Sequence, residues 1–436
     1  MKKIIFLCLS IFTFLAANAQ YQVAGAEEYG DNLTGTNIHK VFVVNGLSGA
    51  ELKYTSSSAS AQFFYYTNSL ADKLPVPAGD ITSYTSGGET IYTIRNLIDS
   101  KGYYAVESGV DKLAAWIIDY SLHHPVLNSI TPIEDADKCQ YLKLGFSITD
   151  DLSFFGTTGV ERKVNRKYTI AYENLVWNDT DKRFDQETVT EENVSGTETV
   201  IEAPLLTTEF TLSGDQFAQA FGIDISLISS TYEAVATEAH IVAEIEKTDG
   251  SLEDIDFTTP GLLFSAPAKI YFDGYANEPT TQYYDWRIYR KLTGQTDWGT
   301  PIARFSDREF YYVFEQHGDF KIELEVANQH SECPSIAQVT FAISESALDQ
   351  PNFFSPGDSP GSNDEWRVAH KSIVKFRCTI FNRWGVKLFQ FTDPDKGWDG
   401  RYKGKRVNPG VYFYVIEATG ADGRKYKRSG DINILK

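Results

Sequence analysis

The sequence has few cysteines and no cysteine motif. Only 4 of its 436 residues are cysteine, and Cys8 lies in the apolar start of the chain. The other three, Cys139, Cys333 and Cys378, are an odd number at wide spacing, which does not indicate a disulfide framework. We interpret each as a small buried apolar residue, with one pairing left open. No C-x-x-C pair or Cys/His cluster is present, so a metal site is not expected.

Recognisable catalytic motifs are also missing. The sequence has no G-x-S-x-G, H-E-x-x-H, P-loop or dinucleotide-binding pattern. The 7 histidines are scattered, and His123-His124 precedes Pro125, which favours a loop over a metal pair. Carboxylates are numerous enough to hide a catalytic pair, but none stands out. We therefore expect a non-enzymatic protein and assign no catalytic residue, cofactor or metal.

Long apolar runs are limited to the start of the chain. Lys2 and Lys3 precede the apolar stretch Ile4 to Leu15, and Ala17-Asn18-Ala19 follows as a small-residue cleavage site. This is the pattern of a secretory signal peptide over residues 1–19. The apolar stretch is too short for a membrane span, and no later one approaches about 18 apolar residues. We expect a chain that is exported across the inner membrane.

Basic residues are scarce outside the last domain. Residues 350–436 hold 16 Lys or Arg and 9 Asp or Glu, a net charge of +7, whereas residues 20–349 hold 22 and 50, a net charge of −28. Such an acidic body keeps a protein soluble. It also disfavours binding to nucleic acid, whose phosphates would be repelled.

Aromatic residues and short alternating runs are abundant instead. The chain has 25 Tyr and 28 Phe, and polar and apolar residues alternate in segments such as His39 to Val44 and Lys321 to Val326. Alternation with β-favouring residues, bounded by turn residues, indicates strands. Ser213 to Phe221 alone favours a short helix. The predicted fold class is all-β, with tandem immunoglobulin-like β-sandwich domains ending in a small antiparallel β-sandwich.

Turn clusters divide the chain after the leader into four domains. They span residues 20–125, an immunoglobulin-like sandwich; 126–262, a β-rich domain of unknown role; 263–346; and 350–436. The second is expected to contain a mobile acidic loop from Asp179 to Glu198. In the third, Tyr312-Val313-Phe314 followed by Gly318-Asp319-Phe320-Lys321-Ile322 resembles the late strands of PKD-type domains.

The last domain carries an ordered series of motifs. They are Pro351 to Asp358, Ile380 to Gly385, Trp398 to Gly400, Pro409 to Tyr414 and the terminal strand Gly430 to Lys436. In this order they resemble the type B C-terminal domain of type IX secretion substrates, also called the gliding motility-associated C-terminal domain. One departure is that the second glycine of the first motif is displaced to Gly361. The resemblance implies sorting by the type IX secretion translocon, docking to an outer-membrane partner of the PorP/SprF type, and a cell-surface or extracellular location.

Each motif residue also has a physical role. Asn382 and Gly385 suit a turn with positive φ, and we expect Trp384 to tuck into the core beside it. Trp398 is expected in the core, with Asp399-Gly400 and Pro409-Gly410 as turns. The candidate sorting and docking motif is Asn382, Arg383, Trp384, Gly385, Trp398, Asp399, Gly400, Pro409, Gly410 and Tyr412. The candidate basic docking surface is Arg401, Lys403, Lys405, Arg406, Arg424, Lys425, Lys427 and Arg428.

Several alternatives stay open at this point. Asp393 and Asp395 have a D-x-D spacing, and their carboxylates could ligate calcium. The loop from Pro356 to Asp364 could do the same, but for both we prefer the interpretation of a solvated turn. An adhesive or scaffolding role is favoured for the body. The alternatives are an enzyme or inhibitor domain in residues 126–262, and a carrier or accessory component of the secretion or gliding machinery. The sequence does not identify the ligand of the N-terminal domains.

Overall fold

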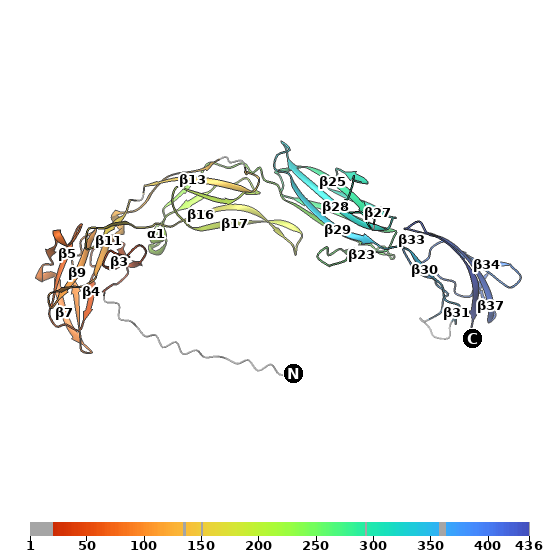
Figure 1. The fold of residues 1–436 in the computed structure, drawn as a ribbon, viewed down its shortest axis with the longest axis horizontal. Coiled ribbons are helices and arrows are strands. Elements are labelled where there is room, and N and C mark those ends of the chain that lie inside the picture. Colours follow the sequence, from red (N-terminus) through yellow and green to blue (C-terminus); the bar gives the residue numbers. More distant parts are fainter. Residues whose placement is uncertain (1–20, 134–136, 150, 293, 357–362, 436) are drawn as a thin grey trace.

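The computed structural model describes residues 21–133, 137–149, 151–292, 294–356 and 363–435. The signal peptide predicted over residues 1–19 lies outside these ranges. The described chain forms four β-sandwich domains in a row, from the first domain at the left of Figure 1 to the last at the right. The all-β prediction is confirmed. Within the described residues, no helix combines the length and apolarity needed to cross a membrane.

The first domain packs two sheets face to face. One has the order β1-β4-β8-β7, and the other the order β2-β3-β11-β9-β5-β6 with β10 beside β9. Alternation along these strands places Phe42, Tyr54, Phe63 and Tyr103 in the core between the sheets. The strands are β1 Tyr21–Val23, β2 Glu27–Tyr29, β3 Ile38–Val44, β4 Leu52–Ser56, β5 Ala61–Tyr66, β6 Leu74–Pro75, β7 Ile81–Ser86, β8 Glu89–Ile94, β9 Lys101–Glu107, β10 Val110–Asp111 and β11 Ala114–Asp119.

The second domain differs from its prediction in one segment. Its sheets are β12-β13-β18 and β17-β16-β19-β20, with a separate hairpin β14-β15. Most of the segment predicted as a mobile acidic loop is instead the 12-residue strand β17, which pairs with β16 along its length. Phe184 and Val189 lie on this strand, and its charged side chains face solvent. The strands are β12 Val126–Ile133, β13 Tyr141–Thr149, β14 Ser153–Phe155, β15 Glu161–Lys163, β16 Tyr168–Asn178, β17 Arg183–Val194, β18 Glu198–Glu202, β19 Thr211–Ser213 and β20 Ser226–Ile228.

The predicted short helix in this domain is present. Helix α1 (Gln216–Phe221) begins where the Asp215 carboxylate accepts a hydrogen bond from the Ala218 amide at 2.9 Å. It ends at Gly222, whose φ of 66° is the left-handed conformation that glycine tolerates best.

The third domain begins earlier than residue 263. Strand β21 (Ala239–Glu246), placed by sequence in the second domain, pairs along its length with β24 (Ala268–Ala276). The apolar residues of β21 therefore complete the hydrophobic core of the third domain, around Trp286 and Phe314. The sheets are β22-β21-β24-β27 and β23-β29-β28-β25-β26. The other strands are β22 Leu252–Asp254, β23 Leu263–Phe264, β25 Thr281–Lys291, β26 Ala303–Phe305, β27 Glu309–Phe314, β28 Gly318–Asn328 and β29 Ser335–Ile343.

The last domain is built on one five-stranded sheet, β31-β38-β37-β33-β34, with β31 parallel to β38. Two short pairs, β30-β32 and β35-β36, complete it. Trp366, Trp398, Phe354 and Tyr414 form its core. The strands are β30 Ala347–Asp349, β31 Phe353–Phe354, β32 Ala369–Lys371, β33 Ile373–Phe381, β34 Lys387–Phe391, β35 Arg401–Tyr402, β36 Lys405–Arg406, β37 Gly410–Gly420 and β38 Lys425–Ile434.

The first two domains share a core. Phe154 on β14 and Phe217 on α1 pack with Trp116 and Tyr120 of the first domain. At this joint the buried Arg166 guanidinium pairs with Asp215 at 2.7 Å, and the Tyr120 hydroxyl donates to the same carboxylate at 2.6 Å. Arg166 also donates to the His123 carbonyl at 2.7 Å, and this buried, hydrogen-bonded charge pair fixes how the surfaces meet, so these two domains are one packed unit.

A disulfide bond joins the second and third domains. It links Cys139 to Cys333, so the interpretation of these two cysteines as unpaired apolar residues is wrong. The pairing could not be read from spacing, since 194 residues separate the two positions and only the arrangement of domains brings them together. Cys378 is buried and free as expected, and burial raises the pKa of its thiol to about 12.

Candidate functional site

The loop between β33 and β34 is held in one conformation by Asn382. Its side-chain oxygen accepts hydrogen bonds from the amides of Trp384 and Val386, both at 3.0 Å. Gly385 has a φ of 78°, as predicted. The same prediction for Asn382 is wrong, because Asn382 acts through its side chain and is not among the residues with positive φ.

Trp384 projects into solvent from this loop. Its exposed fraction is 79%, so the prediction that it packs in the core is wrong. The strand pairing of β33 and β34 ends at Phe381 and Lys387, and the loop therefore extends past the end of the sheet, where no core lies beneath it. The Arg383 guanidinium lies 5.7 Å from the centre of the Trp384 ring, within cation–π range.

Three separated segments, two of which carry motif residues, meet at this end of the domain. A cavity of about 360 Å³, which we call the distal groove, is lined by residues 382–384, Val386, Leu388, Tyr402 and residues 406–412. Pro409-Gly410 turns the chain into β37, with a φ of 144° at Gly410, and the Tyr412 hydroxyl donates to the Asn408 carbonyl at 2.8 Å. A protruding aromatic ring, two guanidinium groups and a turn thus converge on one open surface.

The remaining motif residues stabilise the fold. Trp398 is fully buried, as predicted, and its indole N–H donates to the Arg401 carbonyl at 2.9 Å. Asp399 accepts from the Arg401 amide at 3.0 Å, and Gly400 turns the chain with a φ of 73°. Gly400 also lies against Phe354, where an added Cβ would meet the ring at 3.4 Å. These residues position the groove without forming it.

The predicted basic surface is two groups, not one. Arg406 lines the distal groove, and the β35-β36 hairpin carries Arg401, Lys403 and Lys405 close to it. Arg424, Lys425, Lys427 and Arg428 lie at the other end of β37, since Thr419 pairs with Lys425 whereas Gly410 pairs with Ile434. Arg424 is also paired with Asp422 and with Glu345. A partner at the distal groove would meet the first group only.

Sequence reasoning missed an apolar row on the outer face of the last sheet. Val411, Phe413 and Val415 of β37 have exposed fractions of 39%, 43% and 44%. Phe413 lies opposite Phe381 of β33. The alternation along β37 could have revealed this row, because core positions such as Tyr414 and Ile416 alternate with the outward positions.

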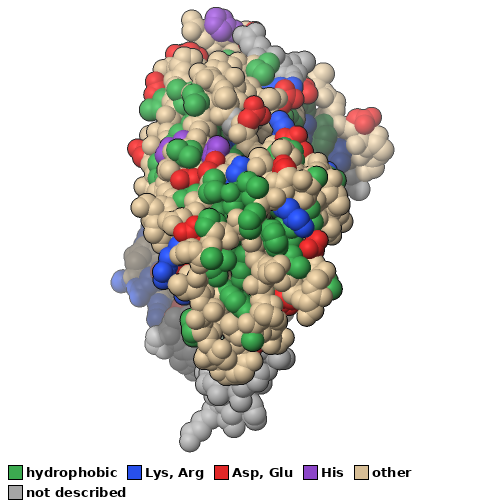
Figure 2. All heavy atoms as spheres, turned by 90° about the vertical axis from the view of Figure 1, so that its left-hand side faces the viewer, with side chains coloured by type: hydrophobic (Ala, Val, Ile, Leu, Met, Phe, Trp, Pro, Cys, Tyr) green, Lys and Arg blue, Asp and Glu red, His purple; other side chains and the backbone are tan. Residues whose placement is uncertain are grey.

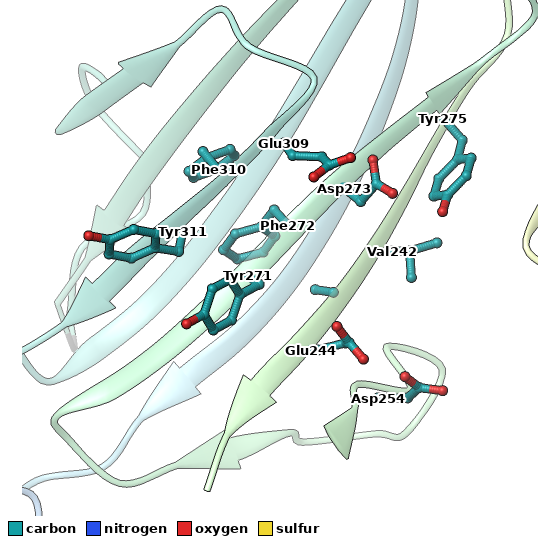
Figure 3. A pocket seen from close by; sticks show the side chains of 11 residues that line it. Val242, Glu244, Asp254, Tyr271, Phe272, Asp273, Tyr275, Glu309, Phe310 and Tyr311 are labelled. Atoms are coloured by element: carbon teal, nitrogen blue, oxygen red, sulfur yellow. The ribbon is translucent and has the colours of Figure 1, made fainter. Parts of the chain in front are cut away.

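A second, larger cavity lies in the third domain. It has a volume of about 550 Å³ and covers the outer face of the β22-β21-β24-β27 sheet, where Glu244, Asp254, Asp273 and Glu309 lie near Tyr271, Tyr275 and Tyr311 (Figure 3). Beside it, the Lys269 ammonium lies 4.8 Å and 4.9 Å from the Tyr271 and Tyr311 rings. The hydrogen bond from Lys269 lowers the pKa of Glu246. This face holds carboxylates and cation-binding tyrosines. Glu244 and Asp254 belong to residues 126–262, the region considered for an enzyme, whereas Asp273, Glu309 and the tyrosines lie beyond it.

The described residues provide no set of ligands for the calcium site considered from the sequence. Asp395 is paired with His370 at 3.0 Å, and its amide donates to Asp393 at 3.0 Å, which is a solvated turn. In the described chain, no group of three or more His, Cys, Asp or Glu side chains is arranged so that it could hold a metal ion. Most of the other candidate loop, residues 357–362, lies outside the described ranges.

Comparisons with known families identify two of the four domains. Residues 348–434 match the CHU_C Type IX secretion signal domain. The last domain therefore carries a type IX secretion signal. Residues 131–230 match a Fibronectin type III domain, one domain upstream of the PKD-like unit expected from the sequence. Both are non-catalytic kinds of domain. The chain is accordingly exported by the type IX secretion system to the cell surface or the extracellular space.

Whole-chain comparisons add little. No curated protein matches the chain. Among solved structures, the crystal structure of dimeric latent PorU from Porphyromonas gingivalis is 11% identical over 74% of this chain and 36% of that chain. Its TM-score is 0.17, which supports no inference about fold or function.

Proposed function

We propose that the chain is a non-enzymatic surface protein that acts as an adhesive or scaffolding unit, with the last domain as its docking module. The distal groove is the docking site, and an outer-membrane protein of the PorP/SprF type is the partner. The observation that carries this proposal is the exposure of Trp384 within a rigid loop, where the motif segments converge. Exposed aromatic and arginine side chains at a preformed groove are the typical anchors of protein interfaces.

The body is suited to display. The type IX secretion signal follows three sandwich domains, and the first two share a core while the second and third are joined by a disulfide bond. Such joints favour a stiff spacer that holds the first domain away from the anchored end. The match of residues 131–230 to a Fibronectin type III domain favours a binding or structural role there over an enzyme or inhibitor. A carrier role in the secretion or gliding machinery is the remaining alternative.

Cell fractionation tests the docking function. Trp384→Ala should leave the chain folded but reduce its retention at the outer membrane, so that it appears in the medium or stays in the periplasm. Val415→Ala is the matched control, because it removes an exposed apolar side chain of the same domain from outside the groove lining. Unchanged surface retention of folded Trp384→Ala would refute docking through the groove.

A further inference from the structure

One edge of the first domain has none of the features that usually protect sheet edges. The edge strands β1 and β2 have three residues each, β6 and β10 have two each, and β2 carries Glu27 and Glu28. Strand β7 is different. It has six residues, Ile-Thr-Ser-Tyr-Thr-Ser, with no charge and no proline, and most of its side chains are exposed. An edge that is long, uncharged and rich in β-branched residues is a template for pairing with another strand.

The unpaired backbone groups of β7 can be assigned. The Arg95 amide donates to the Asp80 carbonyl at 2.9 Å, which fixes the phase of the β7-β8 ladder. Because hydrogen-bonded and non-bonded positions alternate in an antiparallel pair, the N–H and C=O groups of Ile81, Ser83 and Thr85 point away from β8. Within the described chain, β7 pairs with β8 only. Ser83 and Thr85 therefore present both backbone groups to solvent, whereas Ile81 presents only its carbonyl because its N–H donates to the Ala78 carbonyl.

This edge is complementary to itself. When two copies of β7 run antiparallel with Ser83 opposite its counterpart, Ile81 lies opposite Thr85 and each outward amide meets an outward carbonyl. The free amides of Ser83 and Thr85 are then paired on both strands, with the carbonyls of Ser83 and Ile81 as acceptors. On the outer face Tyr84, which is 57% exposed, lies opposite Thr82, a favourable cross-strand pair. No like charges meet within the paired strands.

The charge of the protein restricts which surfaces of two copies can meet. Residues 20–349 carry a net charge of −28, so most surfaces of one copy repel those of another. The uncharged β7 edge lacks this repulsion. Figure 1 places β7 at the outer end of the first domain, away from the other three domains, where a second copy has room to approach. The end face of this domain also carries a gathering of hydrophobic side chains bordered by charged ones (Figure 2).

We propose that β7 is a homotypic docking edge, through which two copies pair antiparallel about Ser83 into a continuous eight-stranded sheet. This goes beyond the docking function of the last domain and is independent of it. A single strand pair buries less than the roughly 800 Å² per partner of a stable interface, so the association is weak in solution. It becomes effective where many copies are anchored on one surface.

Cysteine crosslinking of the purified full chain tests the pairing. In a chain without the predicted signal peptide and its Cys8, native cysteines give no background, because Cys139 and Cys333 are bonded and Cys378 is buried. Ser83→Cys places two thiols at the symmetry axis, about 5.5 Å apart between Cα atoms, which suits a disulfide. Ser86→Cys is the matched control on the same strand, where the two Cα atoms would be about 20 Å apart. A mild disulfide oxidant should produce a covalent dimer with Ser83→Cys only.

A second variant tests the backbone bonds. Thr85→Pro removes an outward N–H and leaves the ladder with β8 intact, whereas Tyr84→Pro would break that ladder. Sedimentation equilibrium should show self-association of the native chain that Thr85→Pro weakens about tenfold, as expected for two lost hydrogen bonds. The proposal is overturned if Ser83→Cys forms no dimer, if Ser86→Cys crosslinks equally well, or if Thr85→Pro associates as strongly as the native chain.

Discussion

Cys139 and Cys333 form a disulfide bond that connects the second and third domains. The link is supported on both sides. Lys138 pairs with Glu332 at 2.8 Å, and the Trp177 ring stacks on His240 at 4.1 Å. Asn277, which is fully buried, donates to the carbonyls of Leu205 and Ala236. The joint thus combines a covalent bond, stacking and buried hydrogen bonds, and we expect little motion between these domains.

Breaking this joint should loosen the chain. Cys139→Ser with Cys333→Ser removes the crosslink, and loss of a native disulfide typically costs about 2–4 kcal/mol. Thermal melting should shift downward, and small-angle X-ray scattering should show a broader distribution of dimensions. Cys378→Ser is a control that leaves the joint untouched. Identical scattering from the native and doubly substituted chains would show that noncovalent contacts alone fix the angle between the second and third domains.

Asp119 makes the first domain sensitive to acid. Burial raises its pKa, but hydrogen bonds from Ser121 and from the amides of Leu47 and Gly46 outweigh this and lower it below the ordinary value. A depressed carboxylate pKa stabilises the folded state above the unfolded pKa of about 3.9, and this contribution is lost as pH falls through the folded value. Asp119→Asn should cost about 2 kcal/mol at pH 7.

The pH profile provides the check on Asp119. Unfolding by urea, measured between pH 7 and pH 3, should show a smaller difference between the native chain and Asp119→Asn at the acid end. A difference that stays constant over this range would mean that the charge of Asp119 does not contribute to stability.

Only the basic group at the distal groove should matter for docking. Arg406→Gln is expected to weaken binding to a PorP/SprF-type partner and to reduce its dependence on salt, because a guanidinium at the groove is lost. Lys425→Gln with Lys427→Gln removes two charges at the far end of β37 and should have little effect. Titration calorimetry at two ionic strengths distinguishes the groups. Equal effects of both changes would indicate attraction by net charge alone.

Trp398 and Trp384 should respond in opposite ways to truncation. Trp398→Ala removes a fully buried ring and should cost on the order of 3–5 kcal/mol, enough to unfold the last domain. Trp384→Ala removes a ring that is 79% exposed, and the melting temperature should change by only a few degrees. A large loss of stability with Trp384→Ala would restore the core interpretation favoured by its sequence context.

These two residues show what the sequence could predict. Trp398 stands beside Asp399-Gly400, a turn that must bend back over the core, so its burial followed from local chemistry. The position of Trp384 depended on where the β33-β34 ladder ends, which local pattern does not reveal. Strand positions and the C-terminal motif were likewise local properties. The Cys139–Cys333 bond and the membership of β21 in the third domain were not, because each depends on pairing between distant segments.

The affinity of the full-length chain for a purified PorP/SprF-type partner tests the central claim most directly. Trp384→Ala should weaken binding by about 30-fold or more, since truncating an interface hot spot costs 2 kcal/mol or more. Val415→Ala should bind as the native chain does, and both variants should melt within a few degrees of it. If Trp384→Ala is folded and binds with native affinity, the distal groove is not the docking site.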